Sequence, residues 1–134
     1  MEVTYLLSEI EPVAHEVLKE TRSQTILFYG EMGAGKTTLI KELLKALGAV
    51  DTGSSPTFSL VNVYETPKGT VNHFDFYRIE DETEALDIGF EEYLESDTWN
   101  FIEWPEKVEN LLDESYQKVE ISIVNKEKRT LKFC

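Results

Sequence analysis

The chain of 134 residues has 26 acidic and 13 basic residues, and its 41% hydrophobic and 29% charged content is typical of a folded domain. Its net charge of −13 argues against direct binding to a nucleic-acid backbone. It has no apolar run near the ~18 residues of a membrane span and no signal-peptide pattern, and its one cysteine is Cys134. We therefore expect a single cytoplasmic domain over residues 1–134, without membrane contact.

The first elements along the chain are predicted to be a short strand and a helix. Residues 3–7 are predicted to form the strand. Ser8 then begins the helix, with Glu11 three residues later as its capping-box partner. The apolar stripe of this helix contains Ile10, Ala14, Val17 and Leu18.

A buried strand, a glycine-rich loop and a second helix follow in direct succession. Residues 25–29 form a continuous apolar run, as in a strand covered on both faces. The helix has one apolar face and ends at Gly48, a residue typical of helix C-terminal caps. The loop between them has the complete Walker A motif, Gly30-Glu31-Met32-Gly33-Ala34-Gly35-Lys36-Thr37.

This motif predicts a site for a nucleoside triphosphate with magnesium. The glycines let successive backbone N–H groups point inward, and the helix that follows adds the positive end of its dipole. Lys36 would reach the β- and γ-phosphates, and the Thr37 hydroxyl would ligate Mg²⁺. We therefore assign nucleotide contact to residues 30–37 and to Thr38.

The second half of the chain adds strands, short helices and two hairpins. Residues 82–95 are predicted to form one or two helices broken at Gly89, and Pro105 opens a short helix. The predicted strands cover residues 58–64, 71–77, 99–102, 118–124 and 129–133. Strands that alternate with helices, together with hairpins, predict an α/β protein: a three-layer P-loop NTPase-like fold with a mixed parallel and antiparallel sheet.

Two acids, Asp75 and Glu103, lie within or directly after apolar strands. Carboxylates in such positions are rare unless a charge or a metal satisfies them. One would be the second magnesium partner and the other would position the attacking water, and the residues leave open which is which. The nucleotide is predicted to be ATP, because the guanine-specific Asn-Lys-x-Asp pattern fails in the predicted turn at residues 125–128, which ends in Lys128.

Residues 71–120 contain 16 acidic and three basic residues, so this stretch alone accounts for the net charge. One interpretation is a solvated, solubilising surface. The other is an acidic face that docks on a basic protein partner.

Four motifs in this order resemble the TsaE family, the bacterial ATPases of tRNA threonylcarbamoyladenosine biosynthesis. They are the P-loop with Thr38, residues 55–58 (Ser-Pro-Thr-Phe), residues 73–78 (His-Phe-Asp-Phe-Tyr-Arg) and residues 103–106 (Glu-Trp-Pro-Glu). The resemblance implies that Thr57 lies in a switch-like loop near the γ-phosphate and that Trp104 lies beside the nucleotide. It also implies that Asp75 is the Walker B-like acid and Glu103 the second acid near metal and water.

The resemblance further implies ATP and Mg²⁺ as cofactors and two protein partners. These are a threonylcarbamoyl transferase subunit and its non-catalytic paralogue, a heterodimer that the ATPase resets, so tRNA is contacted only indirectly. The alternatives are a small-molecule kinase and a nucleotide-dependent binding module that hydrolyses nothing. Kinases usually close several arginines over the phosphoryl group, and this chain has only Arg22, Arg78 and Arg129.

Overall fold

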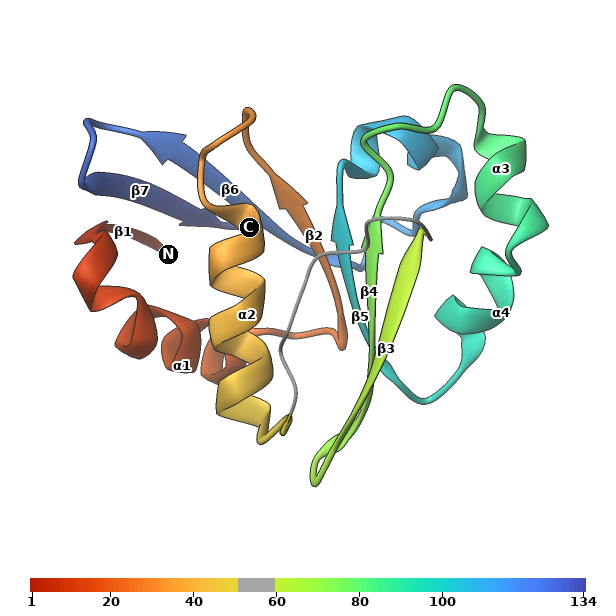
Figure 1. Ribbon diagram of the computed structural model, residues 1–134, viewed down its shortest axis with the longest axis horizontal. Helices are drawn as coiled ribbons and strands as arrows, with labels where there is room; N and C mark the ends of the chain where they lie inside the picture. Colours follow the sequence, from red (N-terminus) through yellow and green to blue (C-terminus); the bar gives the residue numbers. More distant parts are fainter. Residues whose placement is uncertain (51–59) are drawn as a thin grey trace.

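The computed structural model describes residues 1–50 and 60–134, which form a seven-stranded mixed sheet with helices on both faces (Figure 1). The strand order is β1-β7-β6-β2-β5-β4-β3. The strands are β1 (Glu2–Leu6), β2 (Thr25–Tyr29), β3 (Val61–Thr66), β4 (Gly69–Asp75), β5 (Trp99–Glu103), β6 (Gln117–Ile123) and β7 (Lys128–Phe133). The helices are α1 (Ile10–Glu20), α2 (Lys36–Leu47), α3 (Glu82–Asp87) and α4 (Phe90–Glu95), with 3-10 turns η1 (Leu7–Glu9) and η2 (Pro105–Leu111).

The centre of the sheet is parallel and its borders are antiparallel. Strands β4, β5, β2 and β6 run in the same direction, whereas β3, β7 and β1 are attached by antiparallel pairing. The carboxyl ends of the parallel strands therefore meet at one edge, where ligand sites of α/β sheets normally lie. This arrangement confirms the predicted mixed α/β sheet.

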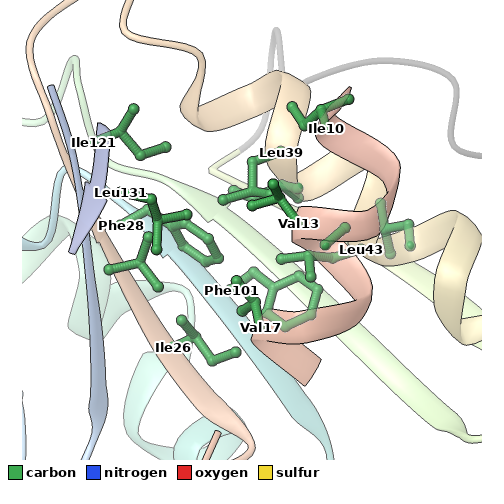
Figure 2. Packing of buried hydrophobic residues seen from close by; sticks show 14 of the residues in the cluster. Ile10, Val13, Val17, Ile26, Phe28, Leu39, Leu43, Phe101, Ile121 and Leu131 are labelled. Atoms are coloured by element: carbon green, nitrogen blue, oxygen red, sulfur yellow. The ribbon is translucent and has the colours of Figure 1, made fainter. Parts of the chain in front are cut away.

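Two hydrophobic cores cover the two faces, because successive side chains of a strand point in opposite directions. Ile26 and Phe28 of β2 pack under α1 and α2 together with residues of β5, β6 and β7 (Figure 2). Leu27, between them in sequence, packs on the other face with residues of α3, α4 and η2. The continuous apolar run of β2 thus reflects burial on both faces, as predicted.

Most predicted elements are confirmed, with shifts of one to three residues at their ends. Gly48 caps α2 with a left-handed backbone, and Gly89 separates α3 from α4 in the same conformation. The helix start at Ser8 is wrong, because the 3-10 turn η1 precedes α1. The capping carboxylate is that of Glu9, which accepts a hydrogen bond from the Leu6 N–H at 2.8 Å, and not that of Glu11.

The segment that follows Pro105 is also corrected, since it is a kinked 3-10 helix that ends at Leu111. Among residues 1–50 and 60–134, no helix has the length and apolar character needed to cross a membrane.

Candidate functional site

The predicted phosphate loop joins the end of β2 to the start of α2 and borders a pocket of about 250 Å³ at the carboxyl edge of the sheet. Its walls come from the loop, the start of α2 and the ends of β4 and β5. The lining residues are Met32, Gly33, Gly35, Lys36, Thr37, Thr38, Asp75, Tyr77, Glu103 and Trp104. Predicted site residues more than 60 positions apart in sequence therefore lie around one cavity.

Two glycines in this loop are required by the local backbone and packing. A Cβ at Gly30 would lie 2.9 Å from the Ile121 carbonyl oxygen and 3.2 Å from the Ala34 Cβ, so no side chain fits there. Gly35 precedes α2 with φ of 105°, a conformation that side chains rarely adopt. The sequence thus enforces a tight curl of the chain at the N-terminus of α2, as phosphate binding requires.

Lys36 is 5% exposed, and its ammonium group lies between two protein groups. The Nζ atom donates to the Gly30 carbonyl and lies 3.6 Å from the centroid of the Trp104 ring. Burial lowers the pKa of Lys36, and the charges of Glu103, Glu106 and Asp75 oppose that effect. Among residues 1–50 and 60–134, the direct contacts of this ammonium are a carbonyl and a ring face, an arrangement that favours the arrival of an anion.

Trp104 forms one wall of the pocket in a strained backbone conformation. Its φ of 58° is the only positive φ at a non-glycine residue in the described part of the chain. Such a conformation costs about 1–3 kcal/mol and tends to occur at functional sites. The Trp104 ring contacts that of Tyr77, with centroids 4.9 Å apart. This backbone conformation therefore places the Trp104 ring directly over the Lys36 ammonium.

Asp75 and Glu103 are neighbours in register at the ends of β4 and β5. The side chains of Asp75 and Glu103 point to the same face of the sheet as Val71 and Phe101, which lie an even number of residues earlier in the same strands. Val71 and Phe101 belong to the core under α2. The two carboxylates therefore face the N-terminus of α2, where the phosphate loop ends.

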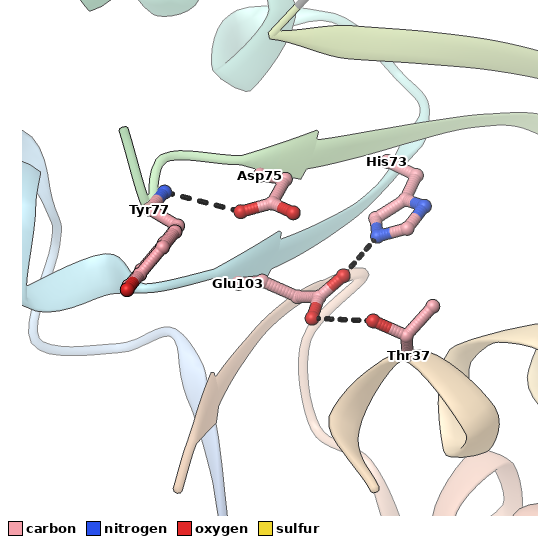
Figure 3. A network of polar contacts seen from close by, with 5 residues as sticks. All are labelled: Thr37, His73, Asp75, Tyr77 and Glu103. Carbon is pink, nitrogen blue, oxygen red and sulfur yellow. Dashed lines mark hydrogen bonds and ion pairs between the residues drawn. The ribbon is translucent and has the colours of Figure 1, made fainter. Parts of the chain in front are cut away.

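The Glu103 carboxylate is 3% exposed and has a hydrogen-bond partner on each oxygen (Figure 3). The Thr37 hydroxyl donates to Oε1 at 2.8 Å, and His73 Nε2 lies 2.6 Å from Oε2. His73 is as deeply buried as Glu103, with 2% exposure. This network fixes the orientation of the carboxylate beside Thr37.

Asp75, in register beside Glu103, is held more loosely. Its Oδ1 accepts from the Tyr77 N–H at 3.1 Å, and no ion pair to it is found within the described residues. Burial raises the pKa of Asp75, and the neighbouring Glu103 charge adds to that effect, while the Tyr77 hydrogen bond, His73 and Lys36 lower it. The carboxylate thus lies in a position that would gain from a cation.

We therefore expect Asp75→Asn to raise the melting temperature in magnesium-free buffer at pH 7.5 by a few °C. A carboxyl group with a raised pKa in the fold destabilises the folded state above that pKa, and the penalty disappears below the ordinary value of about 4. The gain should therefore shrink as the pH falls toward 4. The control is Asp97→Asn, which removes an exposed charge. Equal melting temperatures for the two variants would contradict the assigned burial penalty.

The oxygen donors in this pocket suit magnesium. Thr37, Asp75 and Glu103 offer a hydroxyl and two carboxylates, the hard ligands that Mg²⁺ prefers. Among the residues that the structure describes, no group of three or more histidine, cysteine or acidic residues forms a ready metal cage. That agrees with magnesium, which usually binds through one or two carboxylates together with phosphates and water.

Most predicted site residues converge on the pocket, but some do so indirectly. Gly30 holds Lys36 through its carbonyl, and Ala34 is fully buried behind the loop, whereas Glu31 is exposed and lines a different hollow. Thr57 lies outside the described residues. The sequence analysis missed Arg129, whose guanidinium contacts the phosphate loop from β7. Its only sequence signal is its alternation with the buried Leu131.

Comparisons with known proteins find sequence similarity over most of the chain. Residues 6–131 match the family model described as threonylcarbamoyl adenosine biosynthesis protein TsaE. The tRNA threonylcarbamoyladenosine biosynthesis protein TsaE of Rickettsia prowazekii is 37% identical over 105 residues, which are 78% of this chain and 72% of the relative. The protein of the same name from Bacillus subtilis is 33% identical over 104 residues, 78% of this chain and 65% of the relative.

A solved structure supports the fold independently. The crystal structure of YdiB from Bacillus subtilis matches with a TM-score of 0.75 and 20% sequence identity, over 99% of this chain and 84% of that one. The predicted P-loop NTPase-like fold is thereby confirmed.

Proposed function

Because this chain belongs to the TsaE family, we propose that it is an ATPase that binds Mg-ATP in the P-loop pocket and serves tRNA threonylcarbamoyladenosine biosynthesis. The observation that carries the proposal is the convergence of Lys36, Thr37 and Glu103 around one pocket. A cation, a hydroxyl and a fixed carboxylate at the N-terminus of a helix form a site suited to triphosphate with magnesium.

Each group has a distinct role in this proposal. Lys36 exchanges the Gly30 carbonyl for phosphate oxygens, and the loop N–H groups bind the remaining phosphate charge. Thr37 and Glu103 would hold the metal, since their hydroxyl and carboxylate lie side by side in the pocket. Asp75, in register beside Glu103, orients the attacking water and completes the oxygen donors. Bound magnesium supplies charge neutralisation on the phosphates.

Trp104 and Tyr77 form one wall of the pocket. The Trp104 ring lies against Lys36, so a ligand that draws the ammonium away changes the surroundings of the indole. Tryptophan fluorescence should therefore report nucleotide binding.

The acidic charge favours a protein partner over RNA. On α3 and α4 the acidic side chains Glu84, Asp87, Glu91, Glu92 and Glu95 are exposed, and neither helix contains a basic residue. The partners we propose are the threonylcarbamoyl transferase subunit and its non-catalytic paralogue, with tRNA contacted only through them. Electrostatic attraction of this kind acts mainly on the association rate.

Association with the transferase pair should slow several-fold as salt rises from 50 to 500 mM, because exposed charges are screened within ~8 Å at physiological ionic strength. Replacing Glu91, Glu92 and Glu95 by Gln should slow it at low salt without weakening ATP binding. Surface plasmon resonance measures both effects. A control carries three glutamines on α1, which covers the opposite face of the sheet, at Glu11, Glu16 and Glu20. Equal rates for the two triple variants would exclude α4 as a docking surface.

A kinase is less well supported by the positions of the three arginines. Arg78 is exposed and does not line the pocket, Arg22 lies beside β6, and Arg129 is bonded to backbone carbonyls. Phosphate release from ATP, measured with and without the transferase pair, tests the proposed function and separates the candidates. We expect release that the pair accelerates. No release under either condition would leave the non-hydrolysing module as the better account.

A further inference from the structure

Arg129 lies at the start of β7 with only 8% exposure, on the side of the phosphate loop away from the nucleotide pocket. Its Nε donates to the Ala34 carbonyl at 2.9 Å, and Nη2 lies 3.5 Å from the Gly33 carbonyl. Its Nη1 donates to the carbonyls of Asn125 at 2.7 Å and Lys128 at 3.1 Å. One guanidinium thus joins the phosphate loop to the hairpin turn between β6 and β7.

No carboxylate forms an ion pair with Arg129 within the described residues. A buried cation without a counter-charge is costly, and a hydrophobic residue in its place would usually stabilise a fold at least as well. The planar guanidinium with five N–H donors is suited to several carbonyls at fixed angles. The presence of an arginine here therefore calls for a role besides stability.

The contact with Ala34 fixes the direction of the next amide. A peptide unit is planar and trans, so its C=O and N–H point in opposite directions. While Arg129 holds the Ala34 carbonyl on the hairpin side, the N–H of Gly35 must point to the other side, where the pocket lies. Gly35 is also the N-cap residue of α2, and because glycine tolerates both signs of φ, its own stereochemistry does not fix the orientation of this peptide.

The hairpin that carries Arg129 is itself rigid. Arg129 is paired in register with Tyr5 of β1 and Ile123 of β6, so β7 is held on both sides. The turn is closed by the Asn125 side chain, which accepts from the N–H groups of Glu127 and Lys128 at 2.9 and 3.0 Å. A fixed platform of this kind can hold a loop in place.

We propose that Arg129 is a positioning residue of the nucleotide site, which acts from the C-terminal hairpin by holding the phosphate-loop backbone so that the Gly35 N–H faces the phosphates. The inference rests on the proposed binding of nucleotide. It assigns to the hairpin a part in ligand binding, although no residue of β7 lines the pocket.

The test compares Arg129→Gln and Arg129→Lys with Lys132→Gln, which removes an exposed cation from the same strand. Calorimetric titration with Mg-ATP at 25 °C should show affinity about tenfold or more weaker for Arg129→Gln. A displaced Gly35 N–H would lose its hydrogen bond to a charged phosphate, and the free energy of such a bond corresponds to about this factor. Arg129→Lys should fall between, because one ammonium cannot reach all four carbonyls. Melting curves of each variant identify the conditions under which all of them are folded, and the titrations are carried out under those conditions.

A second readout follows the loop directly and does not need nucleotide. In ¹⁵N–¹H spectra of the ligand-free chain, the Gly35 amide should shift and exchange faster in Arg129→Gln and stay unchanged in Lys132→Gln. Unchanged affinity in Arg129→Gln, with the parent binding normally, would overturn the positioning role and leave the proposed function intact. A parent chain that bound no Mg-ATP would overturn both.

Discussion

Lys36→Ala is expected to weaken Mg-ATP binding at least a hundredfold and to abolish turnover. Of the described residues that line the pocket, Lys36 is the one with a basic side chain. Its Nζ lies between the Gly30 carbonyl and the Trp104 ring, where a phosphate would displace the carbonyl. Charge-assisted hydrogen bonds to phosphate in a partly buried site are among the strongest that a protein forms. Without the Lys36 cation, the negative charge of the triphosphate would be poorly neutralised by the protein.

The fold should survive this change. Burial lowers the pKa of Lys36, which means that the charged ammonium destabilises the ligand-free protein. Its removal therefore offsets part of the stability that is lost with the contacts of the side chain. Calorimetric titration with Mg-ATP and phosphate release would measure the two losses. Lys41→Ala, on the same helix, is the matched control. A Lys36 variant that bound and hydrolysed Mg-ATP like this control would remove the basis for the phosphate site.

Glu103→Gln is expected to reduce phosphate release about a hundredfold or more, with a much smaller effect on nucleotide binding. Loss of a group that holds metal or a proton in the transition state has this typical effect. Glutamine keeps the size of the side chain and an acceptor for the Thr37 hydroxyl, while its NH2 group replaces the oxygen that faces His73 Nε2, so the variant removes the charge and one acceptor. The substitution therefore tests the carboxylate itself.

Glu106→Gln is the control for this experiment. Glu106 is exposed and its charge acts on Lys36, but it does not line the pocket, so it accounts for the general loss of negative charge near the site. Rates are compared in the presence of the transferase pair, at several magnesium concentrations. If magnesium in excess restores the rate of Glu103→Gln, the carboxylate serves mainly to bind the metal. If both variants release phosphate at the parental rate, Glu103 has no catalytic part.

The local part of the site could be predicted from the sequence. The strand, loop and helix of residues 25–47 are continuous in the chain, and their glycines and apolar runs directly encode the conformation. Asp75 and Glu103 could be identified as candidates for the same reason, because an acid at the end of an apolar strand is visible in one short window. The sequence did not reveal that they are neighbours.

That adjacency depends on strand order, which short sequence patterns do not specify. Strand β5 lies between β2 and β4 although it follows both in the chain, and this order places Glu103 next to Thr37 and beside Asp75. Arg129 was missed for a similar reason. It is 95 residues from the Ala34 carbonyl that it contacts, and an arginine in a hairpin usually faces water.

Calorimetric titration of Mg-ATP into the unmodified chain shows whether this pocket binds a nucleotide. We expect saturable binding with a stoichiometry of one, lost when Lys36 is replaced by Ala and stronger than binding of Mg-GTP. We also expect tryptophan fluorescence to change over the same concentration range, because the Trp104 ring lies against the Lys36 ammonium. The absence of binding heat and of a fluorescence change at millimolar Mg-ATP would contradict the assignment of this pocket to a nucleotide.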